Sequence, residues 1–123
     1  MNGSRVLLVE DYEPIWVLLI DELESLGCLV VHAQNGQQAL DLMRAARPAC
    51  IVCDITLPIK DGYAVMAEMR ADPLLKGNPF VAMSAHAESE YIAQVMAAGA
   101  WAYLVKPLEQ DALRACLARL LPG

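Results

Sequence analysis

Five short apolar runs alternate along this chain with segments of helical periodicity. The runs lie near residues 5–10, 28–33, 49–54, 80–84 and 102–106, and the amphipathic segments fill roughly 13–26, 36–46, 61–71, 88–98 and 109–121. Strands that alternate with helices in this way are typical of a parallel sheet with helices on both faces. Because 123 residues suffice for one such unit and not for two, we predict a single α/β domain over residues 1–123.

The first and third runs are the most apolar, which is expected of strands at the centre of a sheet. Right-handed crossovers and the doubly wound, flavodoxin-like order 2-1-3-4-5 make these two strands neighbours. We therefore predict a five-stranded parallel sheet with five helices. A sheet of this class binds its ligands outside the carboxyl ends of the strands, at the point where the order reverses.

Polar side chains follow four of the predicted strands at the point where each strand ends. They are Glu10 and Asp11 after the first strand, Asp54 after the third, Ser84 after the fourth and Lys106 after the fifth. Each alone is explained equally well as a solvated or ion-paired residue at a strand end. Four such strand ends together favour a site at one edge of the sheet.

The carboxylates among these residues suit a hard divalent cation. Mg²⁺ prefers oxygen ligands, and it commonly takes one or two carboxylates while it keeps room for water and a phosphate. We expect Asp11 and Asp54 to bind the ion directly, and Glu10 to reach it directly or through water. The backbone carbonyl of Thr56 is a further candidate ligand, because the loop is expected to turn back over the site there.

A carboxylate beside a metal ion can also act as a nucleophile. Attack by Asp54 on a phosphorus centre would give an acyl phosphate. Lys106 would then neutralise the phosphoryl oxygens, and the Ser84 hydroxyl would hydrogen-bond to one of them. These three residues are the candidates for the chemical step.

The segments that carry these groups resemble the receiver domain of bacterial two-component response regulators. The resemblance rests on residues 6–11, 54–62, 83–85 and 99–107, and it covers the whole chain. It implies a phosphoacceptor signalling switch of a two-component phosphorelay. On this reading a histidine kinase or a histidine phosphotransfer protein phosphorylates Asp54 in the presence of Mg²⁺, and the output passes through protein–protein contact.

The resemblance also implies a conformational switch. Ser84 is expected to move toward the phosphoryl group, and Tyr103 to turn inward behind it, although an aromatic residue on a strand is also explained by core packing. The family further implies a cis peptide bond between Lys106 and Pro107.

One departure from the family concerns a dimer that forms on phosphorylation. Trp101 and Ala102 replace acidic residues that often precede the Tyr-Leu pair in the family. Regulators that dimerise through salt bridges need those acids. We therefore expect either a different dimer contact or a more apolar one in this chain.

The first predicted helix carries more apolar residues than a core stripe requires. A sufficient stripe is Ile15, Leu18, Leu19, Leu23 and Leu26, and the surplus residues are Trp16, Val17 and Ile20. We interpret the surplus as part of a docking patch for a partner's helical bundle, with a partly covered surface stripe as the alternative. The predicted docking residues are Ile15, Trp16, Leu18 and Pro107.

Composition narrows the classes of partner. The net charge is −6 and the nine basic residues form no long run, so we expect no direct contact with nucleic acid. No apolar run approaches the roughly 18 residues of a membrane span, and no signal peptide opens the chain. We therefore expect a cytoplasmic protein without membrane contact, in which the four cysteines are reduced packing residues.

Two alternatives compete with a switch that has no enzymatic turnover. A phosphohydrolase of the haloacid dehalogenase type would also use Asp54 as its nucleophile, but it would carry a second aspartate where this chain has Thr56. A flavodoxin-like cofactor binder would need a phosphate-cradling loop after the first strand, where this chain has Glu10 and Asp11. The switch itself is compatible with a single-domain regulator and with the receiver of a longer protein.

Overall fold

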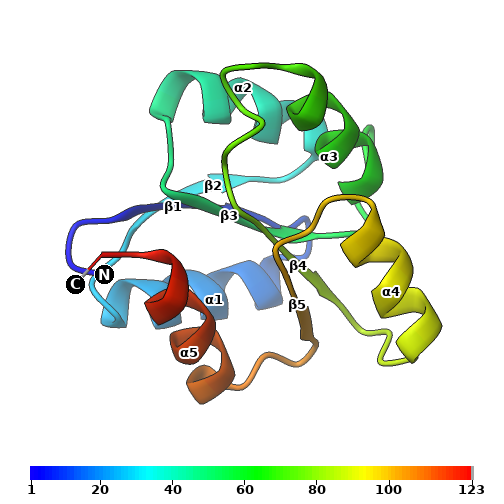
Figure 1. Ribbon diagram of the computed structural model, residues 1–123. Coiled ribbons are helices and arrows are strands. Elements are labelled where there is room, and N and C mark those ends of the chain that lie inside the picture. Colours follow the sequence, from blue (N-terminus) through cyan, green and yellow to red (C-terminus); the bar gives the residue numbers. More distant parts are fainter. Residues whose placement is uncertain (123) are drawn as a thin grey trace.

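The computed structural model describes residues 1–122, so that the last residue of the predicted domain, Gly123, lies outside the described part. The elements are β1 (Arg5–Val9), α1 (Glu13–Ser25), β2 (Leu29–Ala33), α2 (Gly36–Ala46), β3 (Cys50–Asp54), α3 (Gly62–Ala71), β4 (Phe80–Ser84), α4 (Ser89–Ala97), β5 (Ala102–Val105) and α5 (Gln110–Leu120). The five strands are parallel and lie in the order β2-β1-β3-β4-β5 (Figure 1), which confirms the predicted topology.

The sheet is covered on both faces (Figure 1), and each face has its own apolar core. Alternate residues of a strand point to opposite faces, so Leu7 and Ile51 pack toward α2 and α3, whereas Leu8 and Val52 pack toward α1 and α5. Cys50 and Cys53 belong to opposite cores, and all four cysteines are buried and free, as packing residues are expected to be.

Helix α1 corrects one part of the predicted core stripe. Leu19 and Leu23 face the sheet and are buried, but Leu18 is 55% exposed. The reason is helical geometry, because each residue is turned by about 100° from the previous one. Trp16, predicted as surplus, is instead half-buried and packs against the core formed with α5.

The loops at the carboxyl edge of the sheet are fixed by helix caps and by one close backbone approach. The side chain of Asn35 accepts a hydrogen bond from the Gln38 amide at the start of α2. Gly36, the next residue, leaves no room for a side chain, since a Cβ atom there would lie 2.2 Å from the carbonyl oxygen of Lys60. The start of α2 is therefore packed directly against the loop that follows β3.

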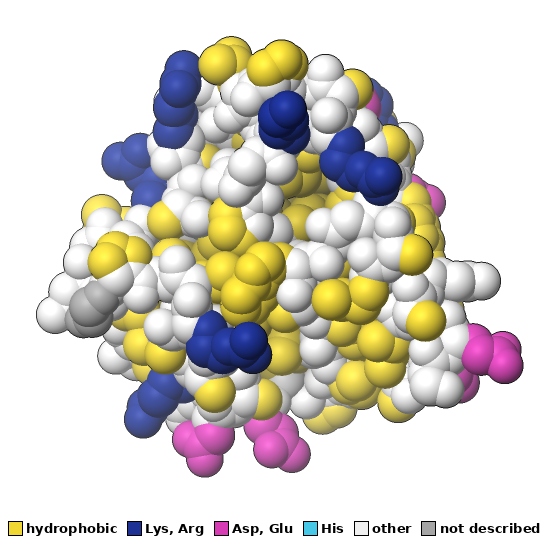
Figure 2. All heavy atoms as spheres, viewed as in Figure 1, with side chains coloured by type: hydrophobic (Ala, Val, Ile, Leu, Met, Phe, Trp, Pro, Cys, Tyr) yellow, Lys and Arg dark blue, Asp and Glu magenta, His cyan; other side chains and the backbone are white. Residues whose placement is uncertain are grey.

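Several helices carry charged residues at the end that suits the helix dipole. Acidic residues lie in the first turns of α1, α4 and α5, and basic residues in the last turns of α2, α3 and α5. Figure 2 shows Lys and Arg side chains in the upper part of one face, over α2 and α3, and also in its lower part, over α5, with Asp and Glu mainly at the lower and right-hand margins. Since helices in this fold begin at the carboxyl edge of the sheet, the acidic first turns of α1, α4 and α5 lie at that edge.

Across residues 1–122, no helix is both long enough and apolar enough to cross a membrane.

Candidate functional site

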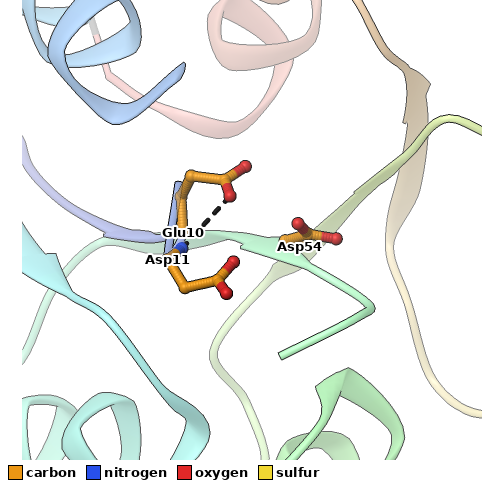
Figure 3. A group of neighbouring side chains, drawn as sticks. All are labelled: Glu10, Asp11 and Asp54. Atoms are coloured by element: carbon orange, nitrogen blue, oxygen red, sulfur yellow. Dashed lines mark hydrogen bonds between the residues drawn. The ribbon is translucent and has the colours of Figure 1, made fainter. Parts of the chain in front are cut away.

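Three carboxylates converge at the switch point of the sheet (Figure 3). Glu10 and Asp11 follow β1 and Asp54 ends β3, and the pairing of Val9 with Cys53 brings these strand ends together. One carboxylate oxygen from each of the three acids lies within 4.8 Å of the others. Glu10 and Asp54 are buried, with exposed fractions of 1% and 7%, whereas Asp11 faces solvent.

Lys106 joins the two buried carboxylates. Its ammonium lies 2.6 Å from Glu10 Oε1 and 2.8 Å from Asp54 Oδ2. Burial lowers the pKa of Lys106, but its hydrogen bonds and charge contacts with Asp54 and Glu10 outweigh this effect, so that the pKa lies above its ordinary value. The ammonium therefore stays charged throughout the physiological pH range.

Glu10 is held at both of its carboxylate oxygens. Oε1 accepts from Lys106, and Oε2 accepts from the backbone amides of Asp11 and Tyr12, both at 3.1 Å. Burial raises the pKa of Glu10 and so does the charge of Asp54, while the bond from Lys106 opposes this rise. Glu10 thus braces the turn between β1 and α1 with one oxygen and contacts Lys106 with the other.

Asp54 uses its second oxygen to hold the following loop. Oδ1 accepts a hydrogen bond from the Thr56 amide at 3.0 Å, and the Thr56 side chain is exposed. Ser84, at the end of the neighbouring strand β4, is buried and its Oγ accepts from the His86 amide at 3.2 Å. The Ser84 carbonyl in turn accepts from the Lys106 amide at 2.7 Å, which links the ends of β4 and β5.

Tyr103 is half-buried and tied to the loop after β4. Its hydroxyl donates to the carbonyl oxygen of His86 at 2.7 Å, and its ring meets Tyr91 edge-on with centroids 6.3 Å apart. The peptide bond between Lys106 and Pro107 is cis, as expected.

Sequence reasoning missed one contact of the site. Nothing in the sequence pattern predicts a role for His32, yet its Nε2 lies 2.9 Å from the carbonyl oxygen of Glu10, and its ring packs against Trp16 with centroids 4.5 Å apart. The parallel register of β1 and β2 is the signal that would have placed His32 near the end of β1.

The donor set of the cluster matches a hard cation. Within residues 1–122 it is the one group of three or more potential ligands whose donor atoms lie this close together, and all of its donors are carboxylate oxygens. Oxygen ligands of this kind suit Mg²⁺ and exclude a thiolate or imidazole site.

Comparison with known proteins gives a match over nearly the whole chain. The family model for the response regulator receiver domain matches residues 6–118. The chain is 35% identical over 105 residues to the polar-differentiation response regulator DivK of Brucella anthropi, with 85% of each chain covered. It is 28% identical over 122 residues to sporulation initiation phosphotransferase F of Bacillus subtilis, covering 99% of this chain and 97% of that protein. It also matches longer proteins, and it spans 25% of the length of one regulatory protein.

The fold is similar to solved structures of the same kind. One of them is the receiver domain of the sensor histidine kinase PA1611 from Pseudomonas aeruginosa, described with a magnesium ion coordinated in its active-site cleft. That structure superposes with a TM-score of 0.89 at 32% identity, covering 96% of this chain and 97% of the other.

Proposed function

The chain belongs to the response regulator receiver domain family, and we propose that Asp54 is the phosphoacceptor of the signalling switch that this family forms. Receiver domains are phosphorylated by histidine kinases and pass the signal to downstream targets. Membership of this family favours the switch over the phosphohydrolase alternative, and we propose that the protein has no phosphomonoesterase activity of its own.

The position of Asp54 carries the proposal. It is a carboxylate that is 7% exposed, lies at the switch point of the sheet and is bonded to an ammonium at 2.8 Å. Charges are rarely buried unless they are paired, and buried ion pairs at the ligand-binding edge of an α/β sheet are candidates for chemistry.

The proposed step is the attack of an Asp54 carboxylate oxygen on the phosphorus of a phosphohistidine. A P–O bond forms, the P–N bond breaks, and the histidine nitrogen keeps the electron pair and takes up a proton. One Asp54 oxygen must first leave its present partner, either Lys106 or the Thr56 amide. Since Lys106 is also bonded to Glu10, its ammonium stays at the site and can follow the phosphoryl oxygens. The Ser84 hydroxyl supplies a second donor to them.

Mg²⁺ is the cofactor that we propose for this step. Asp11 and Asp54 would bind it directly, Glu10 through water, and the carbonyl of Thr56 would complete the protein ligands. Bound there, the ion would neutralise negative charge on the transferring phosphoryl group. The proposal is supported by the three converging carboxylates and by the magnesium in the related receiver domain.

We propose that the kinase or phosphotransfer protein docks on α1 and on the loop after β5. Of the predicted docking residues, Leu18 and Pro107 are exposed, whereas Ile15 and Trp16 are half-buried. Val17 lies next to Leu18 and is 56% exposed. We define the α1 patch as Val17 and Leu18, the exposed apolar pair beside the acidic site.

Activation would change the surface formed by α4, β5 and α5. We propose that Tyr103 gives up its bond to His86 and turns inward as Ser84 moves toward the phosphoryl group. A dimer through this surface would have to accommodate Trp101, which is 39% exposed and lies 5.2 Å beneath the Arg119 guanidinium. Sedimentation with and without beryllofluoride tests the dimer, and a mass that does not change on activation would contradict it.

Mass spectrometry of the intact protein tests the acceptor. After incubation with acetyl phosphate and Mg²⁺, the wild type and an Asp41→Asn control should each gain one phosphoryl group, which alkali removes. Asp54→Asn and the metal-free wild type should gain none. Asp41 is a suitable control because it is an exposed carboxylate on α2. Phosphorylation of the Asp54→Asn protein, or none in the folded wild type, would overturn the proposal.

A further inference from the structure

Both main-chain polar groups of Glu10 are bound by the edge strand β2. The Glu10 amide donates to the carbonyl of Ala33 at 3.1 Å, and the Glu10 carbonyl lies 2.9 Å from Nε2 of His32. The first bond continues the pairing of β1 with β2 beyond Val9. The contact from His32 takes the place of the next backbone hydrogen bond between β1 and β2. The His32 side chain thus extends the pairing of the two strands by one residue toward the acidic site.

The chemistry of the contact between His32 and the Glu10 carbonyl determines which atom is the donor. A carbonyl oxygen can only accept, so the hydrogen lies on Nε2 of His32. Trp16 packs against the same ring at a tilt of 47°, and both residues are half-buried. The indole therefore restricts the rotation of the imidazole and keeps Nε2 directed at Glu10.

Glu10 connects the His32 contact to the expected metal ligands. With its main chain held by β2, Glu10 places its carboxylate against the amides of Asp11 and Tyr12. Asp11 is the exposed member of the acidic cluster, and it depends on this turn to keep its carboxylate near that of Asp54.

We infer that His32, held by Trp16, is a positioning residue that pre-organises the turn between β1 and α1 for Mg²⁺. The inference rests on the Mg²⁺ site of the proposed function. Partners of this kind that orient ligands typically change metal affinity by about 10- to 100-fold when they are removed. Because His32 acts on the main chain of a residue that itself reaches the ion through water, we expect an effect of about tenfold.

Three variants distinguish a positioning role of His32 from a role in packing alone. His32→Leu keeps the bulk and removes the donor, and His32→Gln restores an N–H at similar reach. Val31→Ala is the control, since Val31 is the preceding residue of β2 and packs against the core on the other face of the sheet. Mg²⁺ affinity is measured by NMR from the backbone amides of Asp54 and Thr56, which lie on the β3 side of the site.

His32→Leu should bind Mg²⁺ about tenfold more weakly than the wild type, while His32→Gln retains most of the affinity and Val31→Ala all of it. Without Mg²⁺, the amides of Asp11 and Tyr12 should exchange with solvent faster in His32→Leu than in Val31→Ala. Unchanged Mg²⁺ affinity in His32→Leu would overturn the inference, and so would an equal loss in His32→Gln. Failure of the wild type itself to bind Mg²⁺ would instead refute the proposed site on which the inference rests.

Discussion

Lys106 compensates two buried carboxylates at once, and it does so as the last residue before a cis peptide bond. Its neighbours in the sequence give no indication that it reaches Glu10, which follows β1, three positions away from β5 across the sheet. The contact follows from the order β1-β3-β4-β5 and from the length of the lysine side chain. At the scale of single residues, then, the acidic site is stabilised from the far end of the chain.

Replacement of Lys106 by Met should destabilise the metal-free protein. Glu10 and Asp54 would be left buried without a cation, and breaking a buried ion pair costs about 3 kcal/mol of unfolding free energy or more. Urea denaturation measures this loss, and saturating Mg²⁺ should recover more stability in the variant than in the wild type. Lys60→Met is the matched control, because Lys60 pairs with Glu68 near the surface and such pairs contribute about 0–1 kcal/mol. Equal losses in the two variants would contradict the assigned role of Lys106.

Cys50 gives a pH-dependent prediction. Burial raises the pKa of its thiol from 9.0 to about 12. An unfolded thiol ionises from about pH 9, whereas the folded one keeps its proton, so the contribution of Cys50 to stability should fall as the pH rises above 9. Chemical denaturation of the wild type and Cys50→Ala between pH 8 and about pH 10.5 measures this difference. A difference in stability that stays constant over this range would contradict the prediction.

At the scale of an element, helix α1 shows what an apolar pattern can and cannot predict. Its helical period and its place beside the site were predicted, but the pattern of apolar residues did not distinguish the buried side from the exposed side. With eight apolar residues crowded into the segment Ile15–Leu26, several stripes satisfy the same periodicity. Only packing against β2 and α5 selects Leu19 and Leu23 for the core and leaves Leu18 in solvent.

The α1 patch leads to a test of docking. Leu18→Ala should slow phosphotransfer by about fivefold or more from a histidine phosphotransfer protein that phosphorylates the wild type, because apolar residues central to an interface typically contribute more than 1 kcal/mol. Phosphorylation by acetyl phosphate should not change. Leu29→Ala is the control, since Leu29 is 56% exposed at the opposite edge of the sheet. Equal slowing with both donors would indicate damage to the site rather than to docking.

The start of α2 provides a second prediction at this scale. Gly36→Ala would place Cβ against the Lys60 carbonyl and displace the loop after β3, at a cost of about 1–3 kcal/mol. Gly77→Ala is the control, because no atom lies within 4 Å of a Cβ at that position. Thermal unfolding should give a lower melting temperature for Gly36→Ala than for Gly77→Ala. Equal melting temperatures would show that the loop is displaced without a loss of stability.

The acidic cluster and the acidic first turns of α1, α4 and α5 lie at the same edge of the molecule. This follows from the fold, because helices begin at the carboxyl edge of the sheet and helix dipoles favour acids at helix starts. The three carboxylates of the cluster outnumber the one ammonium of Lys106, so the local charge attracts cations and repels phosphate.

Salt should consequently speed phosphorylation by a small anionic donor. Monovalent ions screen repulsion over a Debye length of about 10 Å at 0.1 M, so the rate with acetyl phosphate at saturating Mg²⁺ should rise as KCl is added. Initial rates over a series of KCl concentrations measure the effect. A rate that falls with salt would show that attraction of the donor by Lys106 and the metal outweighs its repulsion by the acidic groups.

The amino-acid sequence was sufficient to predict the topology and the convergence of Glu10, Asp11, Asp54 and Lys106, because strand ends in a parallel sheet meet at one edge whatever fills the loops. It did not reveal the contact between His32 and Glu10, since that depends on a side-chain rotamer that Trp16 selects. It also did not reveal that both carboxylate oxygens of Glu10 already accept hydrogen bonds. These features arise from packing between elements, which a periodic pattern does not encode.

The charges at the site have a consequence for how its two ligands influence each other. Three carboxylates and one ammonium leave a net charge of −2 if all are ionised, which one divalent cation balances and one monovalent cation does not. Conversion of Asp54 to its acyl phosphate would replace a monoanion by a dianion and disturb that electroneutrality by one unit. The added negative charge should hold the cation more tightly, and thermodynamic reciprocity then requires that the cation favour the phosphorylated form to the same extent.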